Sequence, residues 1–221
     1  MQQRKSKKVL IYFFLLLLVG SINNTNINGL KFQNINNINI TGLDIKNKLI
    51  LLKEIENFNI NNIFLINKID LKDKIESNTL VENYSVFKIY PSSLDINIKK
   101  TKFLAKINKN GQIFYIGSNG KLIKNSSLNN ELPFIFGNPE VFEFFKIKEI
   151  IDKSTIPYTE IKNLYFFPSK RWDLELRDST IIKLPNEDVS RALNLAIEFL
   201  DDNKFIDARI ENQIILDESR N

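Results

Sequence analysis

The feature that most constrains this 221-residue chain is an uncharged apolar run near its N-terminus. Residues 9–22 read VLIYFFLLLLVGSI and directly follow a basic cluster of Arg4, Lys5, Lys7 and Lys8. As a helix the run is about 21 Å long, shorter than the roughly 30 Å apolar core of a bilayer. A run that is apolar on every side and follows basic residues does not suit a buried core helix. It suits a cleavable signal peptide or an uncleaved membrane anchor.

We interpret this run as an uncleaved transmembrane helix. Only a partial match to a signal peptidase site follows it, at Val19-Gly20-Ser21. Lys7 and Lys8 can extend to the membrane interface while the bilayer thins around the short helix. The distribution of basic residues then predicts a cytoplasmic tail at 1–8, a polar tether at 23–30 and an exported region after it.

The residue types that are missing limit the chemistry of the exported region. The chain has no Cys, which excludes disulfides, thiol catalysis and cysteine metal sites. It has no His either, the commonest general base and neutral metal ligand. We therefore expect no enzyme activity, no cofactor, no metal and no small-molecule ligand. The net charge of +5 arises partly in the first eight residues, and elsewhere Lys alternates with acids, so nucleic acid is not an expected partner.

Residues 31–100 switch between strand and helix periods. The expected elements are a strand at 33–40, helices at 48–57 and 70–77, and strands at 84–90 and 94–98. This β-α-α-β-β order predicts a small sheet with two helices on one face.

Residues 101–216 are expected to form a β-rich domain of antiparallel sheet with two helices. Asn119-Gly120 lies between apolar runs and is a strong hairpin signal. Asn138-Pro139-Glu140 and Asn186-Glu187-Asp188 are typical helix starts. A final strand is expected over 205–216, before a tail at 217–221. The predicted fold class is therefore α+β, with an N-terminal transmembrane helix, a small βααββ domain and a β-rich domain.

Six phrases of the sequence follow one another in an order typical of a known family. They are Gly42 after the first strand, FKIYPSSLDI at 87–96, the hairpin at 113–122, Leu132-Pro133 with Gly137, KRWDL at 170–174, and Asp207-Ala208-Arg209. In this order they resemble the bacterial cell-division family FtsQ, called DivIB in Gram-positive bacteria. Tyr90 stands where the family usually has Trp, and the acidic phrase after the Pro turn is absent. The resemblance implies a POTRA domain at about 31–100 and an FtsQ-type β domain at about 101–216.

The resemblance also implies a function. It implies a single-pass protein of the bacterial inner membrane, at the division septum, with bitopic partners of the FtsB and FtsL type. A strand near the C-terminus is expected at a sheet edge, where its free N–H and C=O groups accept a strand from another chain. The expected partner-binding residues are basic or apolar: Lys170, Arg171, Arg209, Ile210, Ile214, Ile215 and Leu216.

Several side chains of this region have competing interpretations. Trp172 is expected in the core, and Asp173, Glu175 and Asp178 on a charged, solvated face. Arg209 either pairs with a neighbouring acid, Asp207 or Glu211, or offers its guanidinium group to a partner carboxylate.

Two other functions stay open. One is an outer-membrane assembly or secretion factor that uses a POTRA domain, although the tandem repeats typical of such factors are not visible. The other is a carboxylate-based periplasmic hydrolase, which requires a deep pocket with two facing carboxylates of raised pKa.

Overall fold

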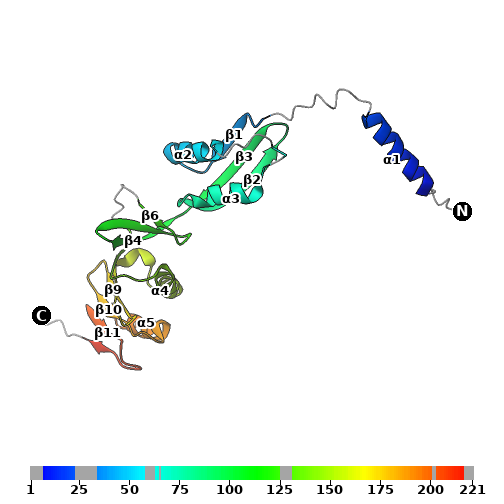
Figure 1. Cartoon of the computed structure of the whole chain (residues 1–221). Coiled ribbons are helices and arrows are strands. Elements are labelled where there is room, and N and C mark those ends of the chain that lie inside the picture. The colour runs from blue at the N-terminus through cyan, green and yellow to red at the C-terminus, as the bar shows by residue number, and fades with distance from the viewer. Residues whose placement is uncertain are drawn as a thin grey trace.

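The computed structural model describes residues 7–22, 34–57, 63–64, 66–124, 131–200 and 203–216. Along the chain it contains a helix, α1, then a domain around a three-stranded sheet and a domain around a nine-stranded sheet (Figure 1). We call these the proximal and the distal domain. The α+β class predicted from the sequence is confirmed. The tails predicted at 1–8 and 217–221 and the tether at 23–30 lie wholly or largely outside the described residues.

The helix α1 (Lys7–Ile22) has 16 residues and covers the apolar run. The large side chains of 9–19 are all more than half exposed. Across the described ranges, no helix is long and apolar enough to cross a membrane. The transmembrane helix predicted at 9–22 is therefore not confirmed by the structure.

The proximal domain has the predicted βααββ order. Its elements are β1 (Asn37–Thr41), α2 (Ile45–Glu56), α3 (Lys68–Ser77), β2 (Val81–Ile89) and β3 (Ser93–Lys100). The sheet order is β1-β3-β2, with β1 parallel and β2 antiparallel to β3. Leu94, Ile96 and Ile98 alternate with polar residues along β3, so they are buried against the helices while the other face of the sheet stays open.

Gly42 ends β1 at a point where no other residue fits. Its φ is +90°, and a Cβ at this position would lie 1.7 Å from the carbonyl oxygen of Ile98. Asp44 then starts α2 by accepting a hydrogen bond from the backbone N–H of Asn47 at 3.3 Å. The glycine therefore sets the turn that carries the chain from the sheet to the helix.

The distal domain contains a mixed sheet rather than the antiparallel sheet we predicted. Its elements are β4 (Phe103–Lys109), β5 (Gln112–Gly117), β6 (Leu122–Ile123), β7 (Phe134–Phe136), α4 (Val141–Lys153), a short 3₁₀ helix (Tyr158–Glu160), β8 (Ile161–Phe166), β9 (Trp172–Leu176), β10 (Ile181–Lys183), α5 (Val189–Ile197), β11 (Phe205–Asp207) and β12 (Ile215–Leu216). The order is β12-β11-β10-β9-β8-β7-β4-β5-β6. The pairs β4–β7, β7–β8 and β10–β11 are parallel. For two of these pairs the physical reason is a helical crossover: α4 connects β7 to β8 and α5 connects β10 to β11, which makes the joined strands parallel.

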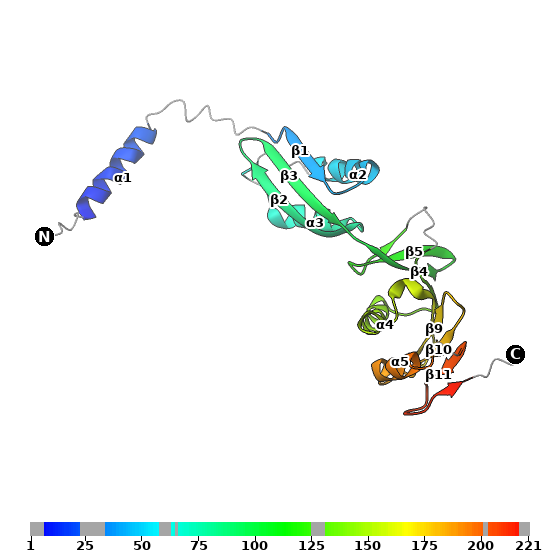
Figure 2. The same cartoon turned by 180° about the vertical axis from the view of Figure 1, so that it is seen from behind.

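The two α-helices of the described distal domain cover one face of its sheet. Figure 2 shows α4 and α5 together on one side of β9, β10 and β11. Trp172 and Leu174 of β9 and Ile182 of β10 point to this side and are buried in the main core. The prediction that Trp172 is a core residue is confirmed, and its ring packs 4.8 Å from that of Phe166. The opposite face, called the open face below, has no helix over it in the described structure.

The single strand predicted at 205–216 is wrong, because the segment forms the two short strands β11 and β12. The side chain of Asp207 accepts a hydrogen bond from the backbone N–H of Arg209 at 3.1 Å, which bends the chain directly after β11. Asn212 has a φ of +57°, and the N–H of Gln213 donates to the carbonyl of Ile210 at 3.1 Å. These local hydrogen bonds turn the chain back, so that β12 runs antiparallel to β11.

The two domains are joined by hydrogen bonds from the turn at 118–121, the hairpin predicted at Asn119-Gly120. The side-chain amide of Asn119 donates to the carbonyls of Thr79 at 2.9 Å and Val81 at 2.8 Å in the proximal domain. The Lys121 ammonium donates to the carbonyl of Glu76 and, at 3.5 Å, to that of Asn78. We call Asn119 and Lys121 the interdomain latch.

Candidate partner-binding site

The strand β12 is one edge of the nine-stranded sheet. Within the described residues it pairs only with β11, through Ile206 with Leu216 and Asp207 with Ile215. Ile214 and Leu216 pack against the main core, whereas Ile215 lies on the open face and is 49% exposed. The edge is therefore fixed from the core side, and a strand of another chain can pair with its outer side.

A row of charged residues leads across the open face to this edge. Asp173 of β9 lies opposite Lys183 of β10, and Lys183 lies opposite Asp207 of β11. Asp207 in turn lies opposite Ile215 of β12. The row places one cation between two carboxylates, and the strand register alone creates this arrangement.

Arg209 is bound to Asp207 by a fork of hydrogen bonds. Its Nε donates to the two carboxylate oxygens at 2.8 and 3.0 Å, and its Nη2 donates to Oδ2 at 2.6 Å. These bonds lower the pKa of Asp207 and raise that of Arg209. Of the two interpretations of Arg209, the structure shows the internal pair. Its side chain is still 42% exposed, so its charge reaches the solvent beside the edge.

Asp173 is buried, so the prediction of a solvated face is wrong for this residue. Its side chain is 7% exposed because it lies between Tyr165 of β8 and Lys183 of β10 on the same face. Burial raises the pKa of Asp173, and Arg171, Lys183 and Arg209 act against this rise. The Nε of Arg171 is 3.5 Å from Oδ1 of Asp173, but both atoms are buried without a hydrogen bond.

The structure brings together only some of the predicted partner-binding residues. Arg171 and Arg209 both lie near Asp173, and Arg171 also stacks on the ring of Phe167 at 3.9 Å. Lys170, with a φ of +63°, instead lines a groove on the helix-covered face beside Trp172 and Val189. Ile210, the remaining member of the predicted set, is half-exposed in the turn before β12.

Glu175 was also expected on a solvated face, but its side chain is only 14% exposed and lies at the centre of a polar network on the open face that sequence reasoning missed. The carboxylate accepts hydrogen bonds from Lys162 at 2.6 Å, Asn163 at 2.9 Å and the Tyr165 hydroxyl at 2.6 Å. The hydrogen bond from Asn163, followed by those from Lys162 and Tyr165, lowers the pKa of Glu175 to about 2. The only sequence signal is the alternation along the two strands, since the contacts depend on the pairing of β8 with β9.

Asp178 lies outside this network, in the turn after β9. Hydrogen bonds from Lys204 and from the N–H and hydroxyl of Thr180 lower its pKa to about 2. It therefore serves as a turn residue with a neighbouring cation. Its placement on a charged, exposed surface agrees with the sequence-based expectation, since its side chain is 52% exposed.

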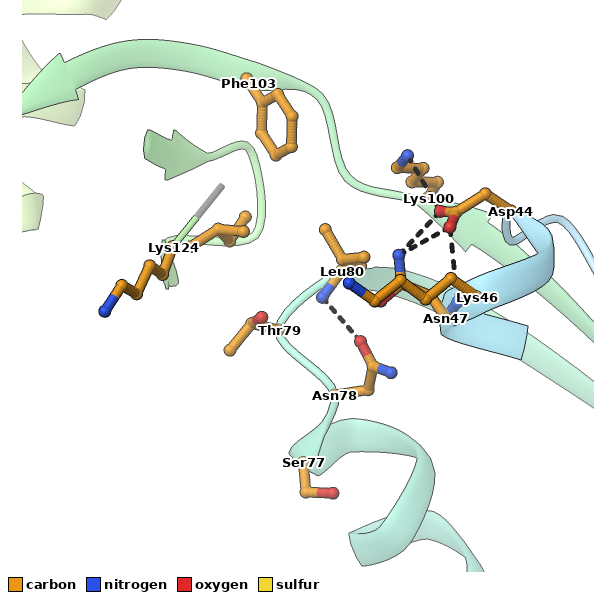
Figure 3. Close-up of a pocket in the computed structure, with 11 residues that line it drawn as sticks. Asp44, Lys46, Asn47, Ser77, Asn78, Thr79, Leu80, Lys100, Phe103 and Lys124 are labelled. Atoms are coloured by element: carbon orange, nitrogen blue, oxygen red, sulfur yellow. Dashed lines mark hydrogen bonds and ion pairs between the residues drawn. The ribbon is translucent and has the colours of Figure 1, made fainter. Parts of the chain in front are cut away.

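A cavity of about 570 Å³ lies between the two domains, and Figure 3 shows the side chains that line it. Its one carboxylate among the described lining residues is that of Asp44. The side-chain hydrogen bond from Asn47 lowers the pKa of Asp44, and Lys100 lies 3.6 Å away. A general acid in a hydrolase requires a raised pKa, whereas the pKa of Asp44 is lowered. Within the described ranges, no group of acidic residues is arranged to hold a metal ion.

Comparison with known proteins identifies the family. Residues 99–211 match the family profile "Cell division protein FtsQ/DivIB, C-terminal", and residues 33–100 match "POTRA domain, FtsQ-type". The chain belongs to the FtsQ/DivIB family. The resemblance seen in the sequence is thereby confirmed, and with it a connection to cell division. The proximal domain corresponds to the POTRA domain, and the distal domain contains the FtsQ/DivIB C-terminal region.

Curated relatives agree with this assignment. The cell division protein FtsQ of Bradyrhizobium diazoefficiens is 25% identical over 119 residues, which are 53% of this chain and 35% of that protein. The FtsQ of Rhizobium meliloti is 22% identical over 132 residues, 59% of this chain and 43% of that protein. The matches thus span less than half of either relative. The solved extracytoplasmic domain of DivIB from Geobacillus stearothermophilus is 12% identical with a TM-score of 0.33, over 42% of this chain and 85% of that one.

Proposed function

We propose that this FtsQ/DivIB family member is a membrane-anchored, non-catalytic scaffold of the bacterial division septum. Its distal domain recruits bitopic partners of the FtsB and FtsL type by strand addition at β12. The observation that supports this most directly is the outer side of β12, which has no partner strand in the described structure and adjoins a charged row.

Charge selects the partner segment. Along the charged row that leads to β12, the three cations Arg171, Lys183 and Arg209 lie beside the two carboxylates of Asp173 and Asp207, so the row itself carries one more cation than carboxylate. Backbone pairing along an edge gives affinity with little sequence preference, whereas a positive surface beside it favours an acidic segment. The partner segment is therefore expected to be extended and acidic.

The membrane anchor is α1. Its apolar side chains are exposed on all sides and lie next to Lys7 and Lys8, as suits a helix in lipid. At 16 residues it is about 24 Å long, which requires local thinning of the bilayer. We place the basic N-terminus in the cytoplasm and both domains in the periplasm, on the basis of the positive-inside rule.

Proline substitutions test strand addition. Neighbouring N–H groups of a strand point in opposite directions, so of Ile215 and Leu216 one N–H faces β11 and the other faces outward. Ile210 and Glu211 fall within the strand predicted at 205–216 but lie in the turn between β11 and β12, so they are not suitable positions for this test. Of Ile215→Pro and Leu216→Pro, one should abolish co-purification of bitopic division proteins from detergent-solubilised native membranes without lowering the Tm. The other should lower the Tm, because it breaks the pairing with β11.

A matched control separates this effect from a general change of surface charge. Lys109→Glu changes a partly exposed residue at the end of β4, six strands away from β12 in the sheet order, and should leave co-purification unchanged. If a chain that lacks residues 214–221 stays folded and still captures the same proteins, strand addition at β12 is wrong.

A further inference from the structure

The proximal domain has an exposed apolar patch at one end of its sheet. Its members are Phe64, Phe87, Ile89 and Tyr90, which are 53–58% exposed. Phe87 and Ile89 lie on the face of β2 that is turned away from α2 and α3, and just past the end of this strand the ring of Tyr90 packs 5.0 Å from that of Phe64, so the four side chains share this end of the sheet. We call these four residues the proximal patch. Apolar side chains gathered in this way on a small domain usually mark a contact surface.

The proximal patch lies at the end of the sheet where the chain enters from α1. Asn37, the first residue of β1, lies opposite Ser93 of β3, and Ser93 lies opposite Ile89 of β2. The N–H of Asn36 also donates to the carbonyl of Ser92 at 2.9 Å. Because adjacent strands are about 5 Å apart, Ile89 lies only about 10 Å from the start of β1. The other end of the same sheet leads to the distal domain (Figure 1).

The length of the chain keeps this patch close to α1. Ile22 ends α1 and Asn37 begins β1, so 15 residue steps separate them. A chain of this length spans at most about 50 Å when fully extended. Wherever α1 binds a membrane, the end of the proximal domain with the patch therefore stays within about 50 Å of that surface.

The chemistry of the patch fits the boundary between lipid and water. Tyr and other aromatic side chains favour this boundary because an apolar ring and a polar hydroxyl meet different environments there. The residue before Phe64 is held to β2, since the Lys88 ammonium donates to the carbonyl of Ile63 at 2.6 Å.

We propose that the proximal patch rests on the membrane surface and holds the POTRA domain against the bilayer that α1 enters. This inference rests on the proposed anchoring of α1. The consequence is a defined height of β12 above the membrane, because the interdomain latch couples the distal domain to the proximal one.

The test uses the full chain in vesicles of phosphatidylcholine and phosphatidylglycerol whose acyl chains carry bromine near the headgroup. Bromine quenches a nearby indole, and the native Trp172, buried in the distal domain, supplies the baseline. Three single variants add one indole each: Tyr12→Trp in α1, Tyr90→Trp in the patch, and Phe136→Trp, which is 44% exposed on the open face of the distal domain. The indole at position 90 should be quenched at least about twofold more than that at position 136. The combination of Tyr90→Trp with Phe87→Ser and Ile89→Ser should lose this difference.

Each outcome decides between the two proposals. Quenching at position 12 with none at position 90 rejects the patch contact and keeps the anchor. Quenching at position 90 with none at position 12 rejects the anchor and keeps a surface contact. Quenching at neither position rejects both. If position 90 is shielded only after native division proteins are added, the patch binds protein and the lipid proposal is wrong.

Discussion

Replacing Glu175 by Gln measures how far one carboxylate on the open face stabilises the distal domain. In the native protein this carboxylate accepts hydrogen bonds from Lys162, Asn163 and Tyr165. Burial, together with the hydrogen bond to Glu175, raises the pKa of Tyr165 to about 12, so the hydroxyl keeps its proton and donates. A Gln side chain offers one acceptor oxygen and turns an NH₂ group toward the other donors. The network therefore does not re-form in the variant.

The pKa of Glu175 gives the size of the effect. The group titrates at about 2 in the folded protein and ordinarily at 4.5. This difference corresponds to about 3 kcal/mol of stability at pH 7, at about 1.36 kcal/mol per pKa unit. Because the folded pKa is depressed, the stabilisation is fully present above pH 4.5 and is lost as the pH falls through about 2. At pH 3 about 1.4 kcal/mol of it remains.

Urea unfolding followed by the fluorescence of Trp172 measures the effect, since this residue is the only Trp and lies in the distal core. In detergent-solubilised full-length protein, Glu175→Gln should lower the free energy of unfolding by about 3 kcal/mol at pH 7 and by about half of that at pH 3. Glu149→Gln is the control, because Glu149 pairs with Lys153 on the exposed side of α4 and should matter little. Equal stability of Glu175→Gln and the native protein at pH 7 would refute the reasoning. A loss of the same size at both pH values would show that packing, not charge, carries it.

Three further predictions follow from the geometry. Gly42→Ala should destabilise the proximal domain by about 3 kcal/mol in thermal unfolding, because the Cβ of the new alanine would meet the carbonyl of Ile98. Gly111→Ala is the control, because Gly111 also has a positive φ, +79°, but has open space around it. Asn119→Ala should weaken the interdomain latch by about 2 kcal/mol, because it removes the hydrogen bonds to Thr79 and Val81. Amide hydrogen exchange should become faster at residues 79–81 but not in β8–β10, and unchanged exchange at 79–81 would contradict the latch. The native protein should keep its N-terminus and require detergent for extraction, and an intact mass that places its start near residues 20–28 would exclude the α1 anchor.

The sequence by itself determined the features that depend on near neighbours along the chain. The alternation of Leu94, Ile96 and Ile98 specified a half-buried strand, because side chains of a strand point to opposite faces in turn. Asn119-Gly120 specified a turn, and Trp172 a core position, for similarly local reasons. The family phrases also depend on such local features. Gly42, for example, stands where a positive φ and a close backbone contact exclude a side chain.

Only the tertiary structure decided which strands become neighbours, and much of the candidate site depends on that. The register of β9 with β8 and β10 buries Asp173 between Tyr165 and Lys183, although the local sequence suggested a solvated charge. The pairing of β12 with β11, and of β11 with β10, makes the short β12 the edge of the sheet, which the single strand predicted at 205–216 did not show. The crossovers through α4 and α5 make the sheet mixed. The physical reason is that periodicity is fixed by residues a few positions apart, whereas register and strand order are fixed by packing between segments distant in sequence.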